Sequence, residues 1–269
     1  MKVFGCQLDI VWENKPANFG RVQEIIASAK PPPGSLVVLA EMFATGFTMN
    51  VSDNAEPAIG KNAGTAAFLA GLARDFGIFL MGGLVSAADN GRGRNQAVVF
   101  SPEGKEIARY SKCQPFTLGG ESLHYEAGTE IITFPWQNCL VAPFICYDLR
   151  LPELFREAAR CGSQLFVVIA EWPIKRIQHW VTLLQARAIE NQAYVIGVNR
   201  TGTDPNFTYS GRSLIINPHG DILADAGQGE GVISAEVDVS AVEAWRKDFP
   251  ALKDMADGET WRRNAEAGG

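Results

Sequence analysis

Apolar runs of strand length limit the folds open to this chain more than any other feature. Residues 36–40 and 165–170 are continuous apolar segments without the alternation of a half-buried strand. Such segments are typical of strands that are covered on both faces. Stretches with helical spacing lie between the predicted strands, at about 16–29, 65–76, 152–160 and 178–192. This alternation of strands and helices predicts an α/β domain.

Antiparallel pairs are mixed into this alternation. Three pairs of strand-length segments are separated by short connections: 95–101 with 105–111, 129–134 with 139–145, and 213–217 with 222–225. Single strands are predicted at 3–10, 78–83, 194–199 and 231–237. The stretch 113–128 has no clear periodicity and is predicted to be an irregular loop. We therefore expect layered sheets that combine parallel and antiparallel strands.

The sequence predicts one domain followed by a C-terminal tail. A chain of 269 residues buries roughly 70–75% of its unfolded surface and needs no covalent staples. No linker or change of composition divides it, so residues 1–250 are predicted to form a single domain. Residues 251–269 are polar and rich in small residues, which predicts a C-terminal tail that is disordered or lies at a subunit interface.

The composition argues against several classes of partner. The formal net charge is −6 and the Lys and Arg residues are scattered, whereas a nucleic-acid partner favours a basic face. The longest apolar run is far too short to cross a bilayer, and the N-terminus lacks the apolar core of a signal peptide. The five cysteines show no Cys-x-x-Cys spacing, which argues against a disulfide framework or a thiolate zinc site. We expect a cytoplasmic protein without a membrane partner.

Three ionisable residues fall at or just past the ends of predicted strands: Glu41, Lys112 and Cys146. Burying a carboxylate, an ammonium and a thiol together is costly unless they serve one another. Together they suit a thiol nucleophile, a base and a cation that faces an oxyanion. Cys146 precedes a helix that begins at Pro152, and the positive end of that helix is expected to favour the thiolate. An inert packed cysteine, or a partnership with one of the three His residues, stays open at this point.

Four segments, taken together and in order, resemble the nitrilase superfamily of carbon–nitrogen hydrolases. They are Ala40-Glu41-Met42-Phe43 with Thr45-Gly46-Phe47, Tyr110-Ser111-Lys112, Cys146-Tyr147-Asp148-Leu149-Arg150-Leu151-Pro152-Glu153, and Gln185 to Val195. The resemblance covers roughly Val3 to Phe249. It implies a four-layer α-β-β-α sandwich with two mixed β-sheets, a homodimer or higher homo-oligomer, and no metal or organic cofactor.

The resemblance also implies roles for individual residues. Glu41 corresponds to the general base, Lys112 to the cation that stabilises the oxyanion, and Cys146 to the nucleophile. Glu121 corresponds to a fourth family position in the loop after the lysine. The backbone N–H of Tyr147 is expected to be the second oxyanion donor.

The residues after the nucleophile are most similar to the omega-amidase branch, which releases ammonia from 2-oxoglutaramate or 2-oxosuccinamate. Such a substrate needs an anchor for its distal carboxylate, and the candidates are Arg150, Lys175 and Arg176. An N-carbamoyl amino acid hydrolase and a non-catalytic binding or scaffold homologue are the alternatives.

Several neighbouring residues carry secondary expectations. Tyr147, Glu171 and Trp172 are expected to line the substrate pocket. Relatives often carry a small or amide residue at the position of Glu171, so this carboxylate is a departure that bears on the substrate. Asp148 and Arg150 are alternatively expected to form a structural ion pair. His179 and Trp180 are expected to be packing residues on a helix face.

Overall fold

A computed structural model describes residues 1–57 and 64–255 of the 269-residue chain. One mixed sheet of six strands runs, in spatial order, through β14 (Gly231–Glu236), β1 (Lys2–Gln7), β2 (Leu36–Val38), β3 (Phe79–Ala87), β4 (Gly93–Phe100) and β5 (Glu106–Ser111). Strands β1, β2 and β3 are parallel, and the outer pairings are antiparallel.

The second sheet repeats this plan. It runs through β13 (Ile222–Asp225), β12 (Leu214–Ile216), β9 (Tyr194–Asn199), β8 (Leu165–Ala170), β7 (Cys139–Ile145) and β6 (Phe134–Trp136). Its central strands β7, β8 and β9 are parallel, and antiparallel pairs flank them. Every residue of β2 and of β8 is buried, which explains why these strands are apolar throughout.

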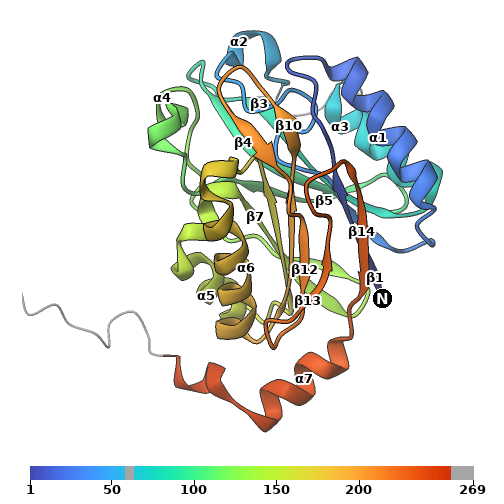
Figure 1. The fold of residues 1–269 in the computed structure, drawn as a ribbon, viewed down its shortest axis with the longest axis vertical. Helices are drawn as coiled ribbons and strands as arrows, with labels where there is room; N and C mark the ends of the chain where they lie inside the picture. Colours follow the sequence, from blue (N-terminus) through green and yellow to red (C-terminus); the bar gives the residue numbers. More distant parts are fainter. Residues whose placement is uncertain (58–63, 256–269) are drawn as a thin grey trace, which may run out of the picture.

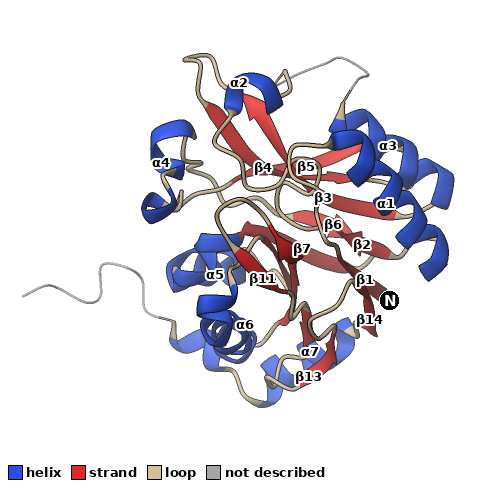
Figure 2. Cartoon of the chain, turned by 45° about the horizontal axis from the view of Figure 1, so that its top comes forward, coloured by secondary structure: helices blue, strands red, loops and turns tan. Residues whose placement is uncertain are grey.

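Helices cover the outer faces of the two sheets (Figures 1 and 2). Helices α1 (Lys15–Ala29) and α3 (Thr65–Phe76) pack on the first sheet, and α5 (Pro152–Arg160) and α6 (Ile177–Asn191) pack on the second. The sheets face each other through β1 and β9, and the apolar core between them is continuous. The fold is therefore the expected α-β-β-α sandwich.

Local sequence signals explain where these helices begin. The Asn14 side chain accepts a hydrogen bond from the Ala17 N–H at the start of α1, and Pro16 occupies the first turn. Pro152 begins α5 in the same way. Proline suits this position because the first-turn N–H groups have no partner within the helix. Helix α7 (Val239–Asp248) begins at the Asp238 cap, whose carboxylate accepts from two backbone N–H groups.

Some expected boundaries are wrong. The antiparallel partner of β7 is the short strand β6 at 134–136, whereas a strand at 129–134 was expected. The stretch expected to be an irregular loop contains helix α4 (Glu121–His124). The ribbon of β10 (Thr201–Thr203) and β11 (Thr208–Ser210), and the short helix α2 (Val51–Asn54), were not predicted. Residues 251–254 of the expected tail form a 3-10 turn, and residues 256–269 of that tail lie outside the described residues.

In the described ranges, 1–57 and 64–255, no helix has both the length and the apolar character needed to cross a membrane.

Candidate active site

Glu41 is placed by a close approach of two backbones. After β2 ends at Val38, the chain passes β3, where the Gly83 N–H donates to the Ala40 carbonyl. A Cβ atom at Gly83 would lie 2.4 Å from the Met42 nitrogen and 2.7 Å from the Glu41 Cα. Only glycine permits this approach, and it leaves Glu41 fully buried.

Cys146 follows the last residue of β7 and begins the 3-10 helix η2 (Cys146–Arg150). Its φ angle of +48° lies in the left-handed region, which costs free energy for a residue other than glycine and is concentrated at functional sites. The residue is buried and lines a cavity. A sharp turn between a strand and a helix thus presents the thiol to that cavity.

Asp148 connects this turn to the segment after β5. Its carboxylate accepts hydrogen bonds from the Tyr110 hydroxyl at 2.7 Å, the Gln114 N–H at 2.8 Å and the Ile145 N–H at 3.1 Å. Burial raises the pKa of Asp148 to about 7, against the opposing effect of Lys112 and these donors. The carboxyl group therefore holds two strand ends together.

The expected ion pair between Asp148 and Arg150 is wrong. The Asp148 side chain is turned into the core, whereas the Arg150 guanidinium lies over the Trp172 ring at 4.9 Å and the Tyr147 ring at 5.6 Å. Arg150 also contacts His179 Nδ1 at 3.2 Å. His179 is exposed and is not a packing residue, unlike its fully buried neighbour Trp180.

Lys112 lies between two buried carboxylates. Its Nζ is 2.9 Å from Glu41 Oε1, and 3.0 and 2.8 Å from the two oxygens of Glu121. The Asn95 Nδ2 bridges the same pair, at 2.6 Å from Glu41 Oε1 and 2.8 Å from Glu121 Oε1. All four residues are buried. The structure thus brings together three of the predicted residues and adds an amide that the sequence reasoning missed.

Electrostatics set the protonation of this cluster. Burial alone would lower the pKa of Lys112, but Glu121 and Glu41 outweigh it and hold that pKa well above its usual value. Burial raises the pKa of the Cys146 thiol well above its ordinary value, and the Glu41 carboxylate adds to this while Lys112 opposes it. Desolvation by burial thus outweighs the Lys112 charge that favours the thiolate. The thiol needs a base to lose its proton.

One cavity contains Cys146 and most of the predicted substrate-binding residues. Its empty space is about 380 Å³, part of it open to solvent, and it is lined by Phe47, Phe116, Cys146, Tyr147, Arg150, Glu171, Trp172, Pro173, Arg176 and Phe207. Lys175 does not line it and instead faces a neighbouring hollow next to 203–208. A narrow space with aromatic walls suits a small linear molecule.

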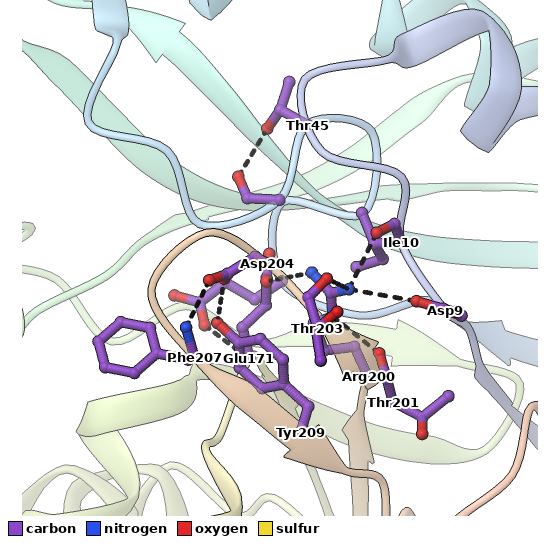
Figure 3. A network of polar contacts seen from close by, with 12 residues as sticks. Asp9, Ile10, Thr45, Glu171, Arg200, Thr201, Thr203, Asp204, Phe207 and Tyr209 are labelled. Atoms are coloured by element: carbon purple, nitrogen blue, oxygen red, sulfur yellow. Dashed lines mark hydrogen bonds and ion pairs between the residues drawn. The ribbon is translucent and has the colours of Figure 1, made fainter.

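Two cations and one acid give this cavity its polar character. Arg150 stacks on Trp172, and the Arg176 guanidinium lies 5.4 Å from the Phe116 ring. Glu171 follows β8, and its backbone N–H donates to Glu41 Oε2 at 2.9 Å. Its carboxyl group pairs with Arg200, which follows β9 (Figure 3).

The sequence carries little signal for the supporting residues. Asn95 lies 54 positions from Glu41, and Arg200 lies 29 positions from Glu171. Phe207 lines the same cavity as Cys146, from a distant part of the chain. Phe207 lies on the turn of the β10–β11 ribbon, which has no apolar run that could have predicted it. Within the described parts of the chain, no group of three His, Cys, Asp or Glu side chains is arranged to hold a metal ion.

The sequence matches proteins of known family along nearly its full length. The Carbon-nitrogen hydrolase family model matches residues 3–247. The chain is 33% identical over 249 residues to 2-oxoglutaramate amidase of Bacillus subtilis (strain 168), covering 93% of this chain and 95% of that protein. It is 36% identical over 259 residues to Omega-amidase YafV of Yersinia enterocolitica, covering 94% and 96%.

A solved structure agrees with this assignment. XC1258 from Xanthomonas campestris, a CN-hydrolase superfamily protein with an arsenic adduct in its active site, matches with a TM-score of 0.86 at 30% identity, covering 96% of this chain and 97% of that chain. Fold, buried cluster and sequence thus lead to one assignment: the chain belongs to the carbon–nitrogen hydrolase family, as an amide-cleaving hydrolase.

Proposed function

We propose that this protein is an omega-amidase-type enzyme that hydrolyses the distal amide of a small 2-oxo acid, such as 2-oxosuccinamate or 2-oxoglutaramate. The observation that carries the proposal is that one cavity is lined by Cys146 together with Arg150 and Arg176. A thiol for the amide and guanidinium groups for a carboxylate are the two features that such a substrate requires.

The first step is attack on the amide carbonyl. Glu41 accepts the Cys146 proton as the sulfur attacks, because the raised pKa of the thiol leaves little thiolate beforehand. The oxyanion is stabilised by the Lys112 ammonium and the Tyr147 backbone N–H. One well-placed donor of this kind lowers the barrier by about 3 kcal/mol.

The second step releases the products. Glu41 returns the proton to the departing nitrogen, ammonia leaves, and a thioester remains on Cys146. Glu41 then deprotonates a water molecule that attacks the thioester. The carbon–sulfur bond breaks, the carboxylic acid is freed, and the departing Cys146 sulfur takes the proton back from Glu41. Glu121 contacts Lys112 Nζ through both oxygens, which supports a role in holding the ammonium in place.

The distal carboxylate is the feature that separates this substrate from a simple amide. Arg150 is stacked on two rings and Arg176 on a third, so both guanidinium groups are held before substrate binds. A charge-assisted hydrogen bond contributes about 1.5–3 kcal/mol. We therefore expect a preference of about ten- to a hundredfold in kcat/KM for a substrate with that carboxylate.

An ammonia-release screen tests the proposal. The panel contains 2-oxosuccinamate, the neutral butyramide, N-carbamoyl amino acids and a nitrile. We expect 2-oxosuccinamate to be the best substrate and Cys146→Ala to lower its turnover at least about a thousandfold. Arg150→Met and Arg176→Met should raise KM for 2-oxosuccinamate and leave butyramide unaffected, with Lys175→Gln as the matched cationic control outside the cavity. Equal rates on 2-oxosuccinamate and butyramide would contradict the proposal, and a preference for carbamoyl amino acids would favour the alternative hydrolase.

The homo-oligomeric state and the cytoplasmic location stay predictions, as does the division into one domain and a tail.

A further inference from the structure

Glu171 is a buried acid whose two oxygens differ in their contacts within the described parts of the chain. Its Oε2 accepts a hydrogen bond from Arg200 Nη1 at 3.2 Å. Its Oε1 has no hydrogen-bond partner among the described residues. The side chain is fully buried from solvent and lines the cavity that contains Cys146. An unsatisfied oxygen in such a place costs free energy, which a ligand could recover.

Arg200 has several partners besides Glu171, all of them on Nε and Nη2. Its guanidinium donates to the carbonyls of Ile10, Thr201 and Thr203 at 2.9, 3.0 and 3.3 Å. It also lies 3.5 Å from the Asp9 carboxylate and stacks on the Tyr209 ring (Figure 3). Because these groups hold Nε and Nη2, the guanidinium stays in place whatever the charge of Glu171, and Nη1 can donate to a neutral carboxyl group as well as to a carboxylate.

Other acids surround Glu171 and oppose a second negative charge. The titratable and charged groups around it are Glu41 after β2 with Lys112 behind it, Cys146 and Arg150 of η2, Arg176 of the 3-10 helix η3 (Ile174–Arg176), Arg200 after β9 with Asp9 behind it, and Asp204 and Tyr209 of the β10–β11 ribbon. Burial raises the pKa of Glu171 to about 8, Glu41 and Asp204 add to this, and Arg200 opposes it. At neutral pH the carboxyl group therefore holds its proton.

The position of that proton follows from the contacts. Since Oε2 accepts from Arg200, the proton lies on Oε1, the oxygen that has no partner among the described residues. A neutral acid with its proton on Oε1 is a hydrogen-bond donor, and it belongs to a residue that lines the cavity. It therefore selects a substrate that brings an acceptor oxygen to this point.

We propose that Glu171 is a specificity-determining residue that, as a neutral carboxylic acid, donates a hydrogen bond from Oε1 to the 2-oxo oxygen of the substrate. The inference rests on the proposed function and names the residue that recognises the 2-oxo group of the substrate. The amide carbonyl is assigned to Lys112 and Tyr147, and the distal carboxylate to Arg150 and Arg176. The 2-oxo oxygen is the acceptor on a 2-oxo acid amide that these groups leave unbound.

The test compares two substrates that differ only in the oxo group, 2-oxosuccinamate and succinamate. Both carry the amide and the distal carboxylate, so the ratio of their kcat/KM values removes any pH effect on the chemical step that the two substrates share. One neutral hydrogen bond predicts that the wild-type ratio is about tenfold in favour of 2-oxosuccinamate at pH 7. This ratio should fall as the pH rises through about 8, because the ionised group is no longer a donor.

Three variants separate the donor from the charge. Glu171→Gln keeps a neutral donor in nearly the same shape, so it should retain the ratio at pH 7 and lose its decline above pH 8. Glu171→Leu removes the donor and should lower the ratio to about one. Lys175→Gln, outside the cavity, should behave as the wild type.

The outcomes distinguish the inference from the function on which it depends. A wild-type enzyme that hydrolyses 2-oxosuccinamate no faster than butyramide overturns both. A wild type with the expected preference for the carboxylate, but with a substrate ratio that Glu171→Leu leaves unchanged or that Glu171→Gln abolishes, overturns the inference alone. If Glu171→Leu does not fold, the pH dependence of the ratio in the wild type and in Glu171→Gln decides.

Discussion

Asn95 shows how a single neutral side chain organises the charged cluster. Its Nδ2 donates to Glu41 and to Glu121, and both carboxylates also contact Lys112. Two carboxylates that share one ammonium repel each other unless further donors lie between them. The amide supplies such a donor without adding charge, so it fixes the distance between the proposed base and its partner.

Asn95→Leu keeps the approximate volume and removes the bridging donor. We expect kcat for the amide substrate to fall about ten- to a hundredfold with a smaller change in KM, because the lost hydrogen bonds misplace Glu41 in the chemical step. Steady-state kinetics measure this. Asn90→Leu, in an exposed turn, is the control and should keep wild-type kcat. An Asn95→Leu enzyme with unchanged kcat would show that the bridge does not position the base.

At the scale of whole elements, burial explains what the sequence could predict. Strand β8 coincides with the apolar run 165–170, because a strand covered on both faces leaves an uninterrupted signal. Helix α3 matches its predicted bounds at 65–76. The ribbon of β10 and β11 leaves no such signal, since each strand has three residues and the two form a small two-stranded sheet.

The same distinction applies to the residues of the candidate site. Glu41 and Cys146 could be predicted because each follows an apolar strand, and the resemblance supplied Glu121. Arg200 and Asn95 could not be predicted, because their partners lie on distant segments of the chain and no local pattern encodes those pairings. Gly83 could not be predicted either, because its contribution is the absence of a side chain where two backbone segments approach each other.

Gly83→Ala tests the approach of β3 to the segment that carries Glu41. The new methyl group meets backbone rather than a flexible side chain, so we expect the free energy of unfolding to fall by about 1–3 kcal/mol. Glu41 should be displaced, so kcat should fall as well. Urea denaturation and amide turnover measure the two effects. Gly71→Ala in α3 has nothing within 4 Å of its new Cβ, and it should be neutral or stabilising by up to about 1 kcal/mol. Equal stabilities of the two variants would contradict the role of Gly83.

At the scale of the whole molecule, the sandwich buries acids between its sheets. Asp148 follows β7 and Glu171 follows β8, neighbouring strands of the second sheet. Each is buried, and burial raises each pKa above its value in the unfolded chain. Folding is therefore linked to the uptake of protons at the C-terminal ends of these two strands.

This linkage predicts that stability falls as the pH rises from about 5 to 8.5. Between the unfolded value near 4 and the folded values of about 7 for Asp148 and about 8 for Glu171, the native state holds protons that the unfolded state has released. Each group then contributes a slope of up to about 1.4 kcal/mol per pH unit. Glu171→Gln and Asp148→Asn each remove one such group, so the Tm of each variant should decline less steeply than that of the wild type. Thermal denaturation of the three proteins across this range measures these slopes. The difference in Tm between each variant and the wild type cancels the contribution of the groups that they share. Parallel curves for wild type and Glu171→Gln would mean that Glu171 is ionised in the folded protein, and the donor assigned to it would then be absent at neutral pH.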